Sequence, residues 1–204
     1  MKLDVVITGV GGQGTILTSR VIAQMAMTKG FEVRTSETIG MAQREGSVVS
    51  HVRIGKDLKG ALIPDSRADV LISLELAETV KGLAKLKSGG LILANTAKII
   101  PTSVPLGLSQ YQGEEIMAFI NQVAAEIRFF DATQVALQAG NYKTVNVVFL
   151  GILSTINDIP FSVDEYLQAI LGILPPKVQE VNKKAFYLGR EMALTTVAVC
   201  DHRV

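Results

Sequence analysis

An apolar strand, a glycine-rich turn and an amphipathic helix open the chain. Residues 3–8 form a nearly continuous apolar and β-branched run, which is typical of a strand buried on both faces. After the turn, apolar residues recur every four positions from Leu17 to Met25, so we expect an amphipathic helix that ends near Gly30. A second strand is expected over residues 31–35. This succession predicts a βαβ unit with a right-handed crossover.

The alternation of strands and helices then continues more loosely. Apolar runs predict three further strands, at residues 69–74, 91–95 and 128–130. Helical stretches are expected over 75–86 and 116–127, with a turn at the glycines that follow Ser88. The segment 46–55 is rich in β-branched residues, and we interpret it as an extra strand or hairpin arm outside the simple alternation.

From Ala132 onward the patterns are helical. Ser162 and Glu165 have the spacing of a capping box, in which each side chain satisfies a backbone N–H of the other residue. Apolar residues spaced by three and four from Val178 to Met192 predict a seam that packs on a neighbouring element. Residues 1–204 are therefore expected to form one α/β domain, with an open, mostly parallel Rossmann-like sheet and a helical C-terminal third.

Composition narrows the class of protein. Of 204 residues, 48% are hydrophobic, which argues against disorder. The 20 Lys and Arg nearly cancel the 19 Asp and Glu, so there is no basic excess for binding nucleic acid. Only 19% of residues are charged, against about 25% in typical soluble chains. We interpret the low content of charged residues as a sign that a protein partner covers apolar surface. We expect this partner to bind a surface that involves the helical C-terminal third.

The cysteine count and the apolar runs exclude several other classes. Cys200 is the single cysteine, and it can neither form an internal disulfide nor hold an iron–sulfur cluster, which takes four thiolates. The most apolar stretch, 145–156, is about 12 residues long, whereas a membrane span needs about 20. No signal-peptide pattern is seen at the N-terminus. We therefore expect a soluble, cytoplasmic protein that binds no membrane.

The turn after the first strand has the pattern G-x-G-x-x-G, at Gly9, Gly11 and Gly14. Such glycines permit a tight turn, a close approach of a ligand and close helix–strand packing, and the helix start offers N–H groups to a phosphate. The candidate contact residues are Gly9, Gly11, Gly12, Gln13, Gly14 and Thr15. A glycine-rich turn that binds no nucleotide is an equally good interpretation. NAD binding is disfavoured because Glu37 lies 28 residues beyond Gly9, later than the usual spacing of about 20.

The segment 36–53 carries the densest set of functional side chains. It begins where the second predicted strand ends, the edge at which open α/β sheets place their ligands. Candidate residues that face a partner or an active site are Glu37, Thr38, Met41, Gln43, Arg44, Ser47 and His51. If 47–54 is extended, Ser47, Val49, His51 and Arg53 share one face, and a solvated polar strand face is the alternative. The Arg44 guanidinium would suit a carboxylate or phosphate on a ligand or partner.

Metal and nucleophile interpretations find little support in the sequence. His51 and His202 are the only histidines, and no G-x-S-x-G elbow occurs to place a nucleophilic serine. Glu75, Asn95 and Asp131 follow predicted strands and could line a cleft. Helix capping is the expected role of each.

Three motifs together resemble a known family. They are GVGGQGT at 9–15, TSETIGMAQR at 35–44 and GSVVSHVR at 46–53. They are similar to the gamma-subunit family of 2-oxoacid:ferredoxin oxidoreductases, and within it most closely to the small subunits of the indolepyruvate type. The similarity extends over nearly the whole chain. One departure is Glu45, where relatives usually carry a glycine.

The resemblance implies an accessory subunit that holds no cofactor and is inactive alone. The complex would decarboxylate a 2-oxoacid, indolepyruvate or another aryl pyruvate, release an acyl-CoA and pass electrons to ferredoxin. Thiamine diphosphate and iron–sulfur clusters would belong to a large catalytic subunit. The glycine turn would then shape the face toward that subunit or assist with CoA phosphates. A stand-alone NAD(P)-dependent oxidoreductase and a non-catalytic nucleotide-binding module are the competing hypotheses.

Overall fold

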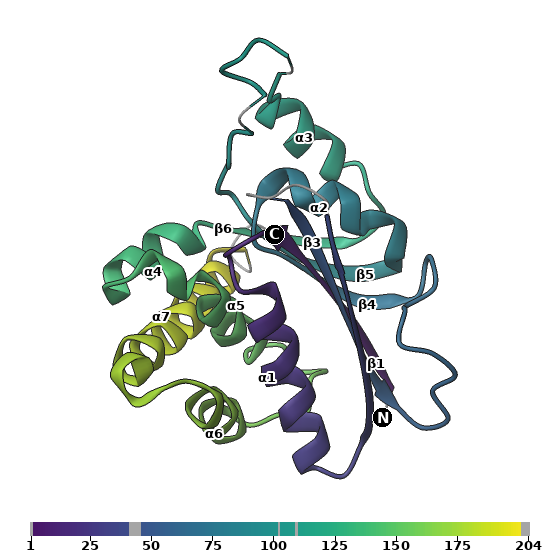
Figure 1. Ribbon diagram of the computed structural model, residues 1–204, viewed down its shortest axis with the longest axis vertical. Coiled ribbons are helices and arrows are strands. Elements are labelled where there is room, and N and C mark those ends of the chain that lie inside the picture. The colour runs from purple at the N-terminus through teal and green to yellow at the C-terminus, as the bar shows by residue number, and fades with distance from the viewer. Residues whose placement is uncertain (1, 41–45, 102, 109, 201–204) are drawn as a thin grey trace.

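One open sheet forms the centre of the molecule, with helices on both of its faces (Figure 1). The computed structural model describes residues 2–40, 46–101, 103–108 and 110–200, with side chains described to residue 196. Its strands are β1 (Leu3–Val10), β2 (Glu32–Ile39), β3 (Ser47–Gly55), β4 (Ala68–Ser73), β5 (Leu86–Asn95) and β6 (Glu126–Phe130). Its α-helices are α1 (Thr15–Thr28), α2 (Leu76–Gly82), α3 (Gly113–Ile120), α4 (Ala132–Ala139), α5 (Val145–Leu153), α6 (Val163–Ile173) and α7 (Pro176–Cys200).

The strand order is β2-β3-β1-β4-β5-β6. β1, β4, β5 and β6 are parallel, whereas β3 runs antiparallel to both of its neighbours, β1 and β2. The predictions of a mostly parallel sheet and of an extra strand over 46–55 are therefore confirmed. The first βαβ unit is nevertheless not a simple one, because β3 lies between β1 and β2 and the two strands joined by α1 do not pair.

The alternation of side chains along the strands divides the core in two. Val5 and Ile7 of β1 point toward the large cluster with α1 and the C-terminal helices, and Val6 points to a smaller cluster under α2 and α3. A strand covered on both faces is apolar at successive positions. This burial explains why residues 3–8 form one continuous apolar run.

The C-terminal helices pack on one another and on α1. A side chain at Gly151 of α5 would collide with the backbone of Phe186 in α7, and one at Gly189 would collide with Val148. These two glycines let the helix backbones approach closely. The seam from Val178 to Met192 thus packs on α5, as the spacing predicts. The seam is used inside the chain, and a partner on the C-terminal third stays a prediction.

Several predicted boundaries shift. The capping box of Ser162 is present at the start of α6. The helix expected over 116–127 ends at Ile120 and is followed by β6. The helix expected over 75–86 ends at Gly82 and continues as a 3₁₀ turn, Leu83–Lys85. The turn expected at the glycines after Ser88 does not form, and β5 runs through these residues. Its pairing with β4 shifts register there, between Leu86 and Leu91, and Gly89 has a φ of +70°. Such a bulge accommodates extra residues without ending the strand. None of the described helices is both long and apolar enough to cross a membrane.

Candidate functional site

Two cavities lie side by side at the carboxyl ends of β1, β4 and β5. The larger, the carboxyl-edge cleft, has a volume of about 730 Å³ and extends from the end of β1 to α2 and α3. The smaller, the glycine-turn cavity, has a volume of about 380 Å³ and is lined by the turn after β1 and by residues before α5. Val10 and Ile99 line both. Both cavities thus lie at the sheet edge where α/β folds place their ligands.

Internal contacts hold the glycine turn in place. The Gln13 side chain accepts a hydrogen bond from Val10 N–H at 2.9 Å and donates one to the Leu74 carbonyl at 3.0 Å, which ties the end of β1 to the end of β4. A Cβ on Gly9 would lie 2.9 Å from the Gln13 oxygen, so this brace requires glycine at position 9. Gly11 N–H donates to the Gly46 carbonyl at 2.9 Å. The Gly11 N–H group is therefore used in a hydrogen bond within the chain.

The start of α1 follows directly on the residues of the glycine turn that line the cavity. Gly14 is the N-cap residue in the left-handed conformation, φ +87°, and no side chain caps the helix there. A Cβ on Gly14 would lie 2.8 Å from the Asn146 side chain, whose Nδ2 is buried without a hydrogen-bond partner among the described residues. Thr15 follows as the first residue of the helix and is buried. Glycine is required here by both conformation and space.

Two lysines reach the glycine-turn cavity from other parts of the chain. Lys98 follows β5 and Lys143 precedes α5, and both line the cavity together with Gly11, Gly12 and Gln13. Both lysines are exposed, and neither forms an ion pair with a carboxylate in the described part of the chain. The combination of cationic side chains with the backbone of a glycine turn that leads into a helix favours an anionic group.

The predicted common face of β3 is real, with His51 buried and Ser47, Val49 and Arg53 half-buried. Ser47 donates to Glu78 at the edge of the carboxyl-edge cleft. At the far end of the strand, Arg53 pairs with the buried Asp4, with Nε 2.9 Å from Oδ1, and it also donates to the Gly60 carbonyl at 3.1 Å. The alternative of a solvated polar strand face is wrong, because the 58–63 segment and α2 cover this face.

His51 lies under the 58–63 segment and is 3% exposed. Its Nδ1 accepts a hydrogen bond from Ile63 N–H at 3.4 Å. Burial, followed by the charges of Lys85 and Arg53, lowers the pKa of His51 from its usual value. The residue lines neither cavity. It stabilises the fold as a neutral core histidine rather than facing a ligand.

Glu75 is the most connected polar residue of the site, and it is 2% exposed. One carboxylate oxygen accepts from Glu78 N–H at 2.9 Å, which caps α2. The other accepts from Ile99 N–H at 3.1 Å and from the Tyr111 hydroxyl at 2.6 Å. Burial and then this hydrogen bond raise the pKa of Tyr111 above its usual value. The capping role expected for Glu75 is confirmed, and a second role as a clamp on the 99–111 segment is added.

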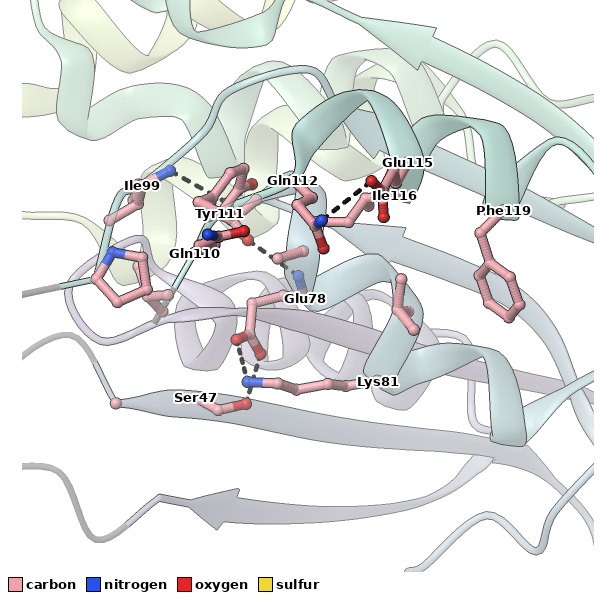
Figure 2. Close-up of a pocket in the computed structure, with 16 residues that line it drawn as sticks. Ser47, Glu78, Lys81, Ile99, Gln110, Tyr111, Gln112, Glu115, Ile116 and Phe119 are labelled. Atoms are coloured by element: carbon pink, nitrogen blue, oxygen red, sulfur yellow. Dashed lines mark hydrogen bonds and ion pairs between the residues drawn. The ribbon is translucent and has the colours of Figure 1, made fainter. Parts of the chain in front are cut away.

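The floor of the carboxyl-edge cleft carries a cluster of three polar side chains that the sequence analysis did not bring together. Figure 2 shows Glu78 and Lys81 of α2 beside Ser47 of β3. The Glu78 carboxylate, 4% exposed, accepts from both the Lys81 ammonium and the Ser47 hydroxyl. The spacing of Glu75 and Glu78 over the first turn of the predicted helix was the available signal. Opposite this polar group, Ile116 and Phe119 of α3 give the cleft an apolar wall.

The two other strand-end residues differ in role. Asp131 caps α4 by accepting from Gln134 N–H at 3.1 Å, as expected. The capping role expected for Asn95 is wrong. Its side-chain amide instead donates to the Leu74 carbonyl at 2.9 Å and to the Thr133 hydroxyl at 3.0 Å, and so fixes β5 to β4 and α4.

Two of the remaining candidates of the 36–53 segment are described by the structure, and neither lines a cavity. Glu37 and Thr38 are exposed residues of β2 rather than of a loop after it, and Glu37 accepts a 3.5 Å hydrogen bond from Ser19 of α1. Met41, Gln43 and Arg44 lie outside the described residues, so their roles stay predictions. Within the described part of the chain, no three His, Cys, Asp or Glu residues gather in a group that could hold a metal ion.

Comparison with known proteins places the chain in a family. A family model described as pyruvate ferredoxin/flavodoxin oxidoreductase matches residues 4–192. The chain belongs to this family. It is 40% identical over 194 residues to the indolepyruvate oxidoreductase subunit IorB of Pyrococcus horikoshii, covering 94% of this chain and 96% of that protein. The protein of the same name from Archaeoglobus fulgidus is 40% identical over 196 residues, which are 96% of this chain and 97% of that protein.

Solved structures agree with the fold. The gamma subunit of a keto/oxoacid ferredoxin oxidoreductase from Geobacter sulfurreducens superposes with a TM-score of 0.70 at 25% identity, covering 95% of this chain and 99% of that chain. The 2-oxoglutarate:ferredoxin oxidoreductase of Magnetococcus marinus, solved with 2-oxoglutarate, coenzyme A and succinyl-CoA bound, gives a TM-score of 0.71 at 22% identity. There the match covers 95% of this chain and 31% of that chain. The same fold thus occurs both as a separate gamma subunit and within a longer chain.

Proposed function

We propose that this protein is the accessory subunit of a complex that oxidatively decarboxylates an aryl 2-oxoacid, indolepyruvate above all, to an acyl-CoA and passes the electrons to ferredoxin. The observation that carries the proposal is the end-to-end match to four proteins named as indolepyruvate oxidoreductase subunits, at 35–40% identity. Subunits named for pyruvate or ketoisovalerate match at 24–25%. This difference supports the aryl substrate class.

The chain's own chemistry supports an accessory role. An iron–sulfur cluster needs cysteine thiolates, and Cys200 is the only cysteine. The residues of this chain therefore do not fit a cluster, and the electron-carrying groups of the reaction belong to the large subunit. We infer that this large subunit, and not the present chain, also binds thiamine diphosphate.

The glycine-turn cavity is the part of this chain that best fits a substrate of the complex. Lys98, Lys143 and the backbone of the glycine turn suit an anionic group, and CoA brings phosphates to the reaction. We infer that the cavity assists in holding a CoA phosphate. Phosphates bound in this way are oriented by fixed N–H groups and neutralised by the two ammonium groups.

The strand order argues against a stand-alone dinucleotide enzyme. In the Rossmann arrangement the second strand neighbours the first, so its terminal acidic residue reaches the ribose. In this protein β3 intervenes, and β2, which carries Glu37, lies two strand spacings, about 10 Å, from β1. Because the G-x-G-x-x-G turn lacks the acidic partner, its resemblance to an NAD site is confined to the turn itself.

The test is steady-state kinetics of the complex reconstituted from this chain and its large subunit. We expect ferredoxin reduction that depends on CoA, with indolepyruvate turned over more efficiently than pyruvate. Lys98→Glu with Lys143→Glu should raise the KM for CoA at least tenfold and leave the KM for the 2-oxoacid unchanged. Lys183→Glu on α7, which lines neither cavity, is the matched charge control. Full CoA-dependent turnover by the large subunit alone would refute the accessory role.

A further inference from the structure

A loop without charge projects from the sheet edge beside the carboxyl-edge cleft. Residues 99–111, here the neutral loop, contain no Asp, Glu, Lys or Arg, although 19% of the whole chain is charged. In Figure 1 the described part of this loop (99–101, 103–108 and 110–111) extends past α3 and forms the end of the molecule farthest from the C-terminal helices. Solvent-exposed loops normally carry polar and charged residues. An uncharged one therefore points to a surface that is covered in the assembled protein.

The exposed side chains of the neutral loop are large and apolar. Leu106 is 71% exposed and Leu108 is 78% exposed, the highest values among the exposed large hydrophobic residues of the described chain. Ile100, at the base of the loop, and Phe119, on the neighbouring α3, are about half exposed, at 49% and 53%. Leu106, Leu108 and Ile100 give the loop an exposed apolar surface, and Phe119 lines the carboxyl-edge cleft on the other side of the view in Figure 2 from Ile99.

The neutral loop is anchored at both ends. The buried Glu75 carboxylate accepts from Ile99 N–H at one end and from the Tyr111 hydroxyl at the other. The loop tip has its own backbone hydrogen bonds, from Gly107 N–H to the Val104 carbonyl at 2.9 Å and from Leu108 N–H to the Ser103 carbonyl at 2.9 Å. A compact loop with close ends is a frequent binding element. Leu106 and Leu108 thus lie on a loop whose backbone is held by its own hydrogen bonds.

We propose that the neutral loop docks into an apolar, uncharged recess of the larger subunit of the oxidoreductase complex, with Leu106 and Leu108 as its buried anchors. The inference rests on the proposed function, which supplies the larger subunit. The chemistry of the loop defines the recess, because a charged recess would have to be desolvated against a loop that offers no counter-charge. A chain in which this fold makes up only 31% of the length is consistent with further protein packed around it.

Docking at the loop would also affect the cleft. Ile99, Gln110 and Tyr111 of the neutral loop line the carboxyl-edge cleft on their inner side (Figure 2). A subunit that covers the outer side of the loop therefore lies beside the cleft. The interface and the cleft are continuous through the same loop.

The seam of α7 does not compete for this role, because it packs on α5. Single exposed leucines do occur on the helical layer, Leu137 of α4 at 51% and Leu194 of α7 at 55%. They supply a control of the same residue type, also more than half exposed. A Leu137→Ser/Leu194→Ser chain tests whether loss of any exposed leucine weakens the complex.

The experiment measures the Kd between the purified full-length chain and the purified large subunit, by calorimetry at 0.1 M and 0.5 M NaCl. We expect Leu106→Ser/Leu108→Ser to raise the Kd at least thirtyfold with an unchanged melting temperature, because the anchors of an interface carry most of its affinity. The control double variant should stay within threefold of wild type. The wild-type Kd should change less than threefold with salt, since uncharged contacts are little screened.

The outcomes separate the two proposals. A wild-type chain that binds no large subunit refutes the proposed function and this inference with it. A wild-type chain that binds, while the loop variant binds equally well, refutes the inference alone. Loss of affinity in the control variant and not in the loop variant places the interface on the helical layer and refutes the inference. Wild-type self-association that the loop variant abolishes, with no change in large-subunit binding, assigns the loop to a second copy and refutes it as well.

Discussion

Replacing Glu75 with glutamine tests the clamp that holds the neutral loop. The carboxylate accepts three hydrogen bonds, from Glu78 N–H, Ile99 N–H and the Tyr111 hydroxyl. A glutamine of the same shape has one acceptor oxygen, so in either orientation its NH₂ group faces at least one N–H donor. Glu75→Gln therefore keeps the packing, loses either the α2 cap or the Ile99 bond of the clamp, and weakens the bonds that remain because their acceptor is no longer charged.

The size of the effect follows from these contacts. A hydrogen bond to a charged group contributes about 1.5–3 kcal/mol, and loss of an N-cap costs about 1 kcal/mol. Because one orientation of the amide retains two of the three bonds, we expect a net loss of about 2–3 kcal/mol. For a chain of 204 residues, each kcal/mol shifts the melting temperature by about 2–4 °C. The melting temperature should thus fall by about 4–12 °C.

Two measurements check the reasoning about Glu75. Calorimetry gives the melting temperature, and limited chymotrypsin digestion reports the loop itself, whose Leu106 and Leu108 should be cleaved faster in the variant. Glu115→Gln is the matched control, because Glu115 also lines the cleft but is exposed and bonds only Gln112; we expect it to melt within about 1 °C of wild type. A Glu75→Gln protein that melts within 1 °C of wild type and is cleaved at the wild-type rate would show that the clamp does not hold the loop.

Two further predictions concern the glycine turn and the buried histidine. Gly14→Ala should lower the free energy of unfolding by about 2–4 kcal/mol in denaturant titrations, because the φ of Gly14 is +87° and a Cβ there would press on the buried Asn146 side chain. Gly12→Ala, where φ is +91° but the space around the Cβ is open, should lower it by only about 1 kcal/mol. Equal losses in the two variants would contradict the packing argument. The pKa of His51 is lowered in the folded protein, so as the pH falls the unfolded chain binds a proton at His51 before the folded chain does. The contribution of His51 to stability should therefore be fully present above about pH 6.5. Below that pH the free energy of unfolding should fall by at most about 1.4 kcal/mol per pH unit. His51→Gln should flatten the stability curve between pH 7 and pH 5 relative to wild type, and parallel curves would contradict this assignment.

Local pattern in the sequence determines most of the secondary structure. The strands at 3–8 and 69–74, the helix after the glycine turn and the capping box at Ser162 depend on contacts within a few residues, so their signals are complete in the sequence. The extra strand over 46–55 could be recognised from its β-branched residues. Its place in the sheet could not, because an antiparallel strand between β1 and β2 depends on pairings across many residues.

The features of the site also differ in whether local sequence or tertiary structure determines them. The sequence alone located the glycine turn, since its glycines are required by local conformation and by the strand and helix on either side. The role of Gln13 as a brace to Leu74, and the arrival of Lys98 and Lys143 at the same cavity, required the tertiary structure. These residues are far apart along the chain, and no local spacing links them.

Burial was the other quantity that the tertiary structure decided. From sequence, His51 and Ser47 share one face of a strand and look equivalent, yet the 58–63 segment covers one while the other reaches the cleft. The lone cysteine, by contrast, argued against a cluster on this chain from sequence alone, because ligand chemistry depends on residue type and number and not on the fold. Whether an apolar stripe is used inside the chain, as in α7, or left for a partner, as at the tip of the neutral loop, depends on which surfaces meet in three dimensions.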